Sequence, residues 1–309
     1  YQSAVYLRPG DYILSIAVLD SGNGQSSVAR QTLRIPAMPD DPFPELDSHL
    51  LAVEFPDGFP QQEVGNDEVN DGELFPISLD QSPIPIATPR PAAIDIVLDI
   101  TKRPVAGASV VFDIYGRPHV SGRGLSPSSI PPYDLEVGRL LQVGSFLSRL
   151  APHPGCVRVS AVDVLRMRTM LDKSNALAID WPGFEKQIQR LDQDTVDVSV
   201  LTNKKGPAEF MRQYLDDLSS GSPACASGGE HYVVVVSHEV PFPAKGGKLS
   251  EADRERARFY YLFSQVGGGM GDDLSGLLKP VKPERLSFNS PRDFRKALAK
   301  IVADLKSQK

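Results

Sequence analysis

The stretch YVVVVS at residues 232–237 decides the fold of this 309-residue chain. Four consecutive β-branched valines end on a serine, and the chain then turns at residues 238–241. A short, continuous apolar run of this kind is typical of a strand buried on both faces, and such strands belong to parallel sheets covered by helices. We therefore predict an α/β fold with a doubly wound, mostly parallel sheet.

Patterns on either side of this stretch predict the other elements of the sheet. Short β-branched runs alternate with segments whose apolar residues recur at helical spacing, as expected for helices that cover both faces of a sheet. Residues 167–171 are expected to return antiparallel to the strand before them. The predicted strands are 94–101, 108–114, 157–164, 232–237, 258–266 and 285–288, and the predicted helices are 134–150, 181–191, 207–218, 272–278 and one that begins at 291.

Residues 1–91 form a smaller β-rich segment. Apolar residues alternate over 11–20, a turn rich in glycine and small polar residues follows, and 28–36 is the return strand of a hairpin. Eleven of the 27 prolines lie within 36–91, which excludes a helix there, and we expect 81–91 to be an extended connector. The predicted domains are therefore 1–91, an Ig-like or partial-sandwich β segment, and 92–309, the α/β domain.

Charge and motifs exclude several classes of partner and cofactor. The net charge is −6 and no basic face is visible, so we expect no nucleic-acid binding. No apolar run approaches the roughly 20 residues of a membrane-spanning helix. The glycines at 267–271 do not fit the Gly-x-Gly-x-x-Gly spacing, and no phosphate-binding P-loop motif occurs. We therefore predict no cofactor.

The two cysteines, Cys156 and Cys225, each precede a predicted parallel strand, which places them at the same end of the sheet. They have no metal-ligand spacing. Two alternatives stand: a disulfide in an extracytoplasmic protein, either secreted or periplasmic, or two separate thiols. The chain opens at Tyr1 without an initiator methionine, which we interpret as a trimmed or mature fragment.

Three segments carry a resemblance to the von Willebrand factor A (VWFA) family. HYVVVVSHE at 231–239 resembles the family's fourth strand. RARFYYLFSQVGGG at 256–269 and the segment at 277–305 are similar to its fifth strand and its last elements. PGDYILSIAVLD at 9–20 is similar to a strand that precedes such a domain in bacterial VWFA-related proteins. The resemblance covers residues 93–309 and implies a doubly wound domain that binds protein partners.

The resemblance also implies a metal-ion-dependent adhesion site, whose first strand carries Asp-x-Ser-x-Ser. If 108–114 is that strand, the motif reads Asp113, Tyr115 and Arg117; if 94–101 is that strand, it reads Asp99 and Thr101, followed by Lys102-Arg103. Both registers remain open. His238 replaces the family's fourth-strand aspartate, and a hard cation such as Mg²⁺ needs several oxygen ligands. We therefore predict a degenerate site that holds no metal.

The favoured function is a non-enzymatic protein-binding or assembly module. Ligands of open α/β sheets collect at the carboxyl ends of the strands. A structural domain of a larger secreted protein and an enzyme that uses the same crevice are the alternatives. No catalytic residue is assigned, because side chains of adjacent strand residues alternate between faces and 237–239 cannot form a relay. The candidate binding residues are Asp99, Thr101, Asp113, Tyr115, Arg117, Ser237, His238 and Glu239.

Overall fold

The computed structural model describes residues 6–7, 9–36, 53–54, 83–101, 109–112, 118–121, 133–190, 205–220, 229–238, 248–264, 273–289 and 291–308. The chain divides into two units, Tyr1–Val69 and Asn70–Lys309. Each unit is described by itself below.

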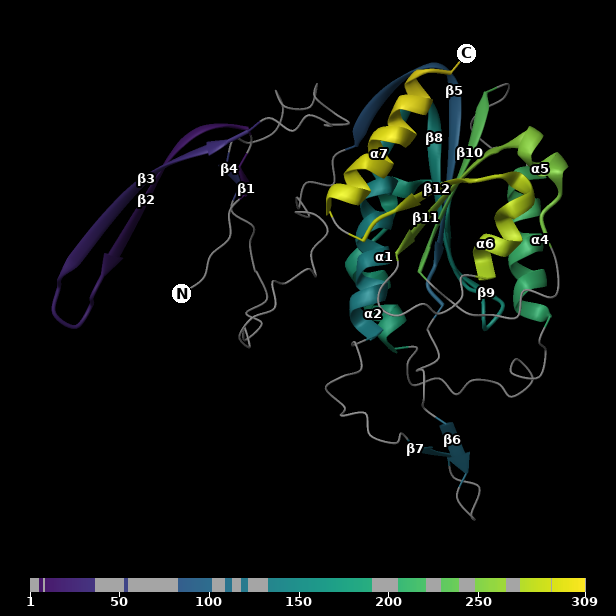
Figure 1. Cartoon of the computed structure of the whole chain (residues 1–309), viewed down its shortest axis with the longest axis horizontal. Coiled ribbons are helices and arrows are strands. Elements are labelled where there is room, and N and C mark those ends of the chain that lie inside the picture. Colours follow the sequence, from purple (N-terminus) through teal and green to yellow (C-terminus); the bar gives the residue numbers. More distant parts are fainter. Residues whose placement is uncertain are drawn as a thin grey trace. The chain divides into compact units, whose positions relative to one another are not determined.

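The second unit is built on a six-stranded sheet (Figure 1). Every neighbouring pair is parallel except the pair at one edge, where β9 runs antiparallel to β8. The predicted α/β class with a mostly parallel sheet is therefore confirmed, and so is the antiparallel return after 157–164. Across the sheet the strands are β12 (Glu284–Ser287), β11 (Arg258–Ser264), β10 (Glu230–His238), β5 (Ile84–Asp99), β8 (Leu150–Asp163) and β9 (Arg168–Lys173).

The direction in which strands are added to this sheet reverses next to β5. The chain first adds β8 and β9 on one side of β5, and then adds β10, β11 and β12 on the other side. The strands β5 and β10 are therefore neighbours at the point of reversal. In open α/β sheets the crevice at the carboxyl ends of such a strand pair is where ligands bind.

The valine run lies at the centre of the sheet, as predicted. Val233, Val234, Val235 and Val236 are each at most 1 % exposed, and β10 pairs in parallel with β5 on one side and with β11 on the other. Burial of each valine side chain stabilises the fold by about 1.5–3 kcal/mol. This strand therefore contributes to the apolar layers on both faces of the sheet.

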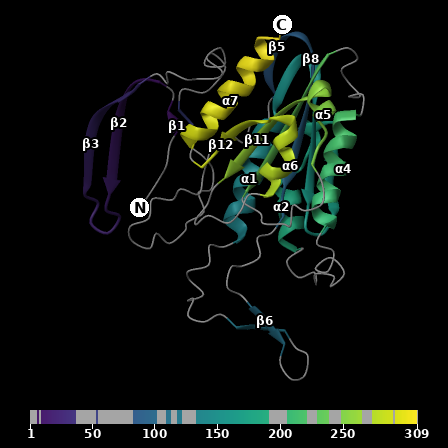
Figure 2. The ribbon, with the colours of Figure 1, turned by 45° about the vertical axis from the view of Figure 1, so that its right-hand side comes forward.

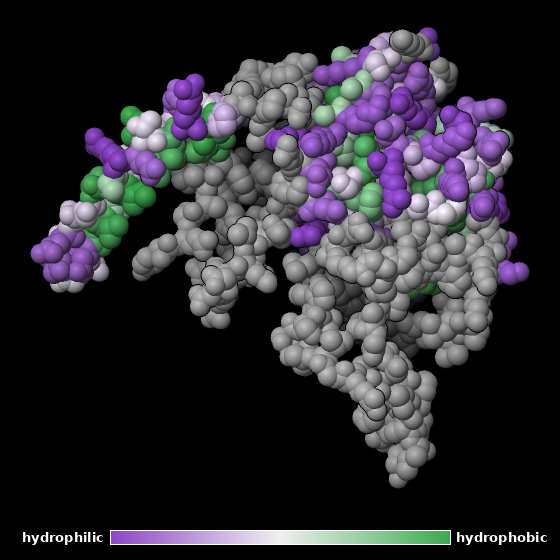
Figure 3. Space-filling model, viewed as in Figure 1, coloured by the Kyte–Doolittle hydropathy of each residue, from purple (hydrophilic) through white to green (hydrophobic). Residues whose placement is uncertain are grey.

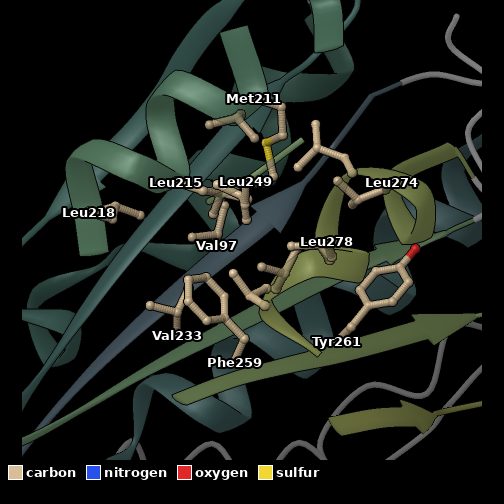
Figure 4. Close-up of a cluster of buried hydrophobic side chains, with 14 of the residues drawn as sticks. Val97, Met211, Leu215, Leu218, Val233, Leu249, Phe259, Tyr261, Leu274 and Leu278 are labelled. Atoms are coloured by element: carbon tan, nitrogen blue, oxygen red, sulfur yellow. The ribbon is translucent and has the colours of Figure 1, made fainter. Parts of the chain in front are cut away.

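Helices cover both faces of the sheet (Figures 1 and 2). One face carries α1 (Tyr133–Ser148), α2 (Trp181–Arg190) and α7 (Pro291–Lys306); there Phe146 and Phe294 meet edge to face with centroids 5.8 Å apart. The other face carries α4 (Gly206–Ser220), α5 (Glu251–Arg256) and α6 (Asp273–Leu278). Its apolar cluster includes Val97, Val233, Met211, Leu215 and Leu274 (Figure 4).

The pairing of β5 settles which predicted strand is the first strand of the sheet. It is 94–101, because β5 lies at the centre. The alternative segment, 108–114, contributes β6 (Ser109–Phe112), which pairs antiparallel with β7 (Pro118–Ser121) in a separate two-stranded sheet. Asp99 therefore lies at the end of the first strand of this sheet.

Three local expectations need correction. Residues 84–91, expected within the connector, form the first part of β5, where 84–87 pair with the start of β8. The strand predicted to begin at 157 begins instead at Leu150, because residues 150–153 pair with 84–87. The helix α5 was not predicted, although Ser250 and Asp253 form a capping box at its start.

The first unit contains the predicted hairpin, formed by β2 (Gly10–Leu19) and β3 (Ser26–Ile35). In its turn, the side chains of Asp20 and Asn23 each accept a hydrogen bond from a backbone amide two residues on, and Gly24 adopts a φ of 71°. Strands β1 (Tyr6–Leu7) and β4 (Val53–Glu54) form a second antiparallel pair. In the described parts of both units, no helix is long and apolar enough to span a membrane.

Candidate functional site

Two polar side chains meet where β5 and β10 end. Asp99 is the last residue of β5, and the register of the two strands, with Leu98 beside Val236, places Ser237 next to it. The Ser237 hydroxyl donates a hydrogen bond of 2.8 Å to Asp99 Oδ2. Both residues are fully buried. The contact joins segments 138 residues apart at the point where the strand order reverses.

Thr101 extends this contact to the third strand. Its backbone amide donates to Asp99 Oδ1 at 3.1 Å, and its hydroxyl accepts a 2.7 Å hydrogen bond from the amide of Val164, which follows β8. Asp99, Thr101 and Ser237 therefore tie together the carboxyl ends of β10, β5 and β8. We call these three residues the rim network.

Burial controls the acidity of Asp99. Loss of solvent raises the pKa of its carboxyl from 3.8 to about 6, against the opposing effect of the hydrogen bonds from Thr101 and Ser237. The nearby Asp163 carboxylate raises the pKa slightly further. Asp99 therefore changes its charge between pH 5 and 7, inside the network that joins three strands.

Asp163, the last residue of β8, forms ion pairs with Arg166 and Arg168. The Arg166 guanidinium donates to Asp163 Oδ2 at 2.7 Å, and the Arg166 amide donates to Oδ1 at 3.2 Å. Arg168 approaches Oδ2 at 3.8 Å. The side chain of Asp163 is 5 % exposed and that of Arg168 is 35 % exposed. A buried acid and a partly exposed arginine therefore stand together at the carboxyl end of β8.

His238 and Ser264 end the two strands on the far side of β5. They are neighbours in the register of β10 and β11, and both are at most 2 % exposed. Since strand residues alternate between faces, His238 lies on the opposite face from Ser237. The Ser264 hydroxyl has no hydrogen-bond partner among the described residues.

The structure brings three of the eight candidate binding residues together, namely Asp99, Thr101 and Ser237. His238 ends the same strand as Ser237 but on the other face. The remaining candidates, Asp113, Tyr115, Arg117 and Glu239, lie outside the described residues. Sequence reasoning missed residues whose only signal was that they lie near an end of a predicted strand, namely Asp163, Arg166, Arg168 and Ser264.

The side-chain oxygens of the rim network all take part in hydrogen bonds. Each carboxylate oxygen of Asp99 accepts a hydrogen bond from a neighbour in the network, and the Thr101 hydroxyl accepts the Val164 amide. Within the described parts of the chain, no three His, Cys, Asp or Glu side chains form a group suited to a metal ion.

The amino end of the sheet carries different chemistry. Cys156, in the middle of β8 and beside Ala93 of β5, is disulfide-bonded, and the one other cysteine of the sequence, Cys225, lies outside the described residues. On the neighbouring strands, His231 Nε2 lies 2.6 Å from Asp95 Oδ2. This buried pair joins β10 to β5 at the opposite end from the rim network.

Comparisons with known proteins add no family assignment. The chain was compared with protein-family models and with curated proteins, and neither comparison found a match.

Proposed function

We propose that the unit 70–309 is a VWFA-like, non-enzymatic module that binds a protein partner at the carboxyl end of its sheet without a metal ion. The observation that carries this proposal is the rim network, which lies where the strand order reverses. Both carboxylate oxygens of Asp99 accept hydrogen bonds from the other two residues of the network. Binding at this end follows from the general behaviour of open α/β sheets. The choice of a protein as the ligand follows from the family resemblance.

The sheet topology supports the VWFA-like description. Numbered along the chain, the six strands stand in the order 3-2-1-4-5-6, which is a doubly wound arrangement, and helices cover both of its faces. The first strand ends in Asp99, where the family motif begins. The motif continues with Thr101 and then Arg103, in whose place the family has serine.

An extracytoplasmic location accompanies this proposal. Cys156 is disulfide-bonded, and structural disulfides persist in oxidising compartments. A partner would then be a secreted, periplasmic or cell-surface protein.

The metal-free part of the proposal is tested by isothermal titration calorimetry with Mg²⁺ and with Ca²⁺. We expect no saturable binding at submillimolar concentration, because both oxygens of Asp99 already accept hydrogen bonds. Saturable submillimolar binding that disappears in Asp99→Asn would overturn this part.

The location of the binding surface is tested with a matched pair of arginine variants. Arg168 lies at the carboxyl end of β8 and Arg158 lies nearer the amino end; each faces an aspartate, and their side chains are 35 % and 40 % exposed. Immobilised wild type and both variants are exposed to an extracytoplasmic extract of the source organism. We expect Arg168→Ser to lose a captured protein that Arg158→Ser retains. Equal capture by both variants, with circular dichroism unchanged, contradicts binding at the rim.

A further inference from the structure

The two strands of the N-terminal hairpin differ in a way that distinguishes edge strands from interior strands. β2 reads GDYILSIAVL and has one charged residue, Asp11 at its second position, whereas β3 reads SSVARQTLRI and has two, Arg30 and Arg34. Natural sheets protect a free edge with charged side chains, because uncharged edges pair with other strands. The strand β3 therefore has the composition of an edge and β2 that of an interior strand.

The exposed side chains of β2 agree with this assignment. Ile16 and Val18 are 52 % and 63 % exposed on one face, and Ile13 and Leu19 are 74 % and 69 % exposed on the other. The apolar residues form an almost continuous green stretch along the hairpin in Figure 3. Among the described residues, no strand pairs with the outer edge of β2. An isolated two-stranded hairpin is marginal in water, whereas three or more strands with an apolar face are stable.

We propose that a second copy of this chain supplies the missing neighbour, and that the β2 strands of the two copies pair antiparallel about a twofold axis at Ser15. This register places Leu14 opposite Ile16 of the other copy and Tyr12 opposite Val18. Each side chain stays on its own face of the sheet, because directly opposed residues in an antiparallel pair point the same way. The result is a four-stranded sheet in the order β3-β2-β2-β3, with twofold symmetry.

Charge selects this edge over the other. Pairing of two copies through β2 opposes Asp11 to Leu19 and brings no like charges face to face. Pairing through β3 would bring Arg30 and Arg34 of both copies, four arginines in all, into one short ladder. Opposed like charges destabilise a strand pair. The pairing through β2 also leaves an arginine-bearing strand at each outer edge, which limits growth beyond two copies.

The first test is the oligomeric state of the whole chain, measured by sedimentation over a concentration series. The expected species is a dimer of about twice the 33.6 kDa chain mass. Ile16→Lys places a cation beside the proposed axis, so this variant is expected to remain monomeric. Val28→Lys is the matched control: Val28 is 61 % exposed but lies on β3, and its variant is expected to dimerise as the wild type does. A monomeric wild type, or equal dimerisation of both variants, overturns the proposal.

The second test fixes the register and does not depend on the stability of a charged variant. Two residues on the twofold axis of an antiparallel pair have Cα atoms about 4.5–5.5 Å apart, within the range of a disulfide. Ser15→Cys is therefore expected to form a covalent dimer on mild oxidation, and Thr32→Cys on β3 is not. Cross-linking of Thr32→Cys but not of Ser15→Cys overturns pairing through β2. Absence of cross-linking in both variants at concentrations where the wild type dimerises overturns the proposed register.

Discussion

At the scale of single residues, Asp99 combines two properties that oppose each other. Its carboxyl group is fully buried, which favours the neutral acid, while Thr101 and Ser237 direct hydrogen-bond donors at it, which favours the carboxylate. Burial is the larger effect, and the pKa rises to about 6. The charged form of Asp99 is therefore destabilising in the fold at neutral pH.

This balance predicts a pH dependence of stability. Because the pKa of Asp99 is higher in the folded chain than its ordinary value of 3.8, protonated Asp99 stabilises the folded chain relative to the unfolded one. This stabilisation is fully present below pH 3.8 and is lost as the pH rises through about 6. The difference between the two pKa values corresponds to about 3 kcal/mol. Asp99→Asn, which carries no charge, is expected to remove this decline, as measured by urea unfolding from pH 4 to 8.

The readout is the difference between the wild-type and variant curves, because other groups titrate in the same range. Asp172→Asn serves as the control, since Asp172 is paired with Arg158 and 45 % of its side chain is exposed. That variant should keep the wild-type slope between pH 4 and 6. An unchanged slope in Asp99→Asn would falsify the assignment of the transition to this residue.

At the scale of elements, helix α1 approaches the sheet closely because Gly144 has no side chain. A Cβ atom at this position would lie 2.5 Å from Leu98 Cδ1 and 3.0 Å from the Trp181 ring. Leu98 lies in β5 and Trp181 opens α2, so one glycine sets the packing of a strand and two helices. At Gly138, six residues earlier in α1, a Cβ atom would meet nothing within 4 Å.

The two glycines make a matched pair of predictions. Gly144→Ala is expected to lower the free energy of unfolding by about 1–3 kcal/mol, because the methyl group overpacks the interface. Gly138→Ala is expected to raise it by up to about 1 kcal/mol, since alanine favours a helix more than glycine does. The free energies of unfolding of both variants are measured by chemical denaturation. A stabilised Gly144→Ala would show that Leu98 and Trp181 move aside for the methyl group without destabilising the fold.

At the scale of the whole molecule, the chain separates into a β-rich unit and an α/β unit, and the disulfide of Cys156 belongs to the second. If its partner is the only other cysteine, Cys225, the bond closes a loop of 68 intervening residues. A covalent closure of a long loop stabilises a fold mainly by restricting the unfolded chain.

Reduction is therefore expected to lower the stability of the α/β unit by about 2–4 kcal/mol. The measurement is thermal unfolding of the wild type with and without dithiothreitol, followed by far-ultraviolet circular dichroism. The control is Cys156→Ser, in which the reductant should have no further effect. A wild type whose unfolding temperature is the same in both buffers contradicts a stabilising role for this bond.

Much of the α/β unit follows from local pattern, because helices and buried strands impose periods that the sequence carries directly. The valine run, the hairpin at 10–35 and the helices near 133, 181, 206 and 291 were predicted for this reason. The two strand segments that were missed share one cause. Residues 84–91 and 152–155 are rich in proline and give no strand signal of their own, and they lie in strands because 84–87 pair with 150–153 and Ala92 pairs with Gly155.

The sequence by itself predicted a buried parallel sheet, because a short β-branched run flanked by segments of helical periodicity is typical of a strand covered by helices on both faces. Only the tertiary structure decided which segment is the first strand of that sheet and which polar groups meet at its end. Asp99 and Ser237 are 138 residues apart and share no local pattern. Their contact depends on the order in which the strands pair, and that order depends on packing across the whole domain.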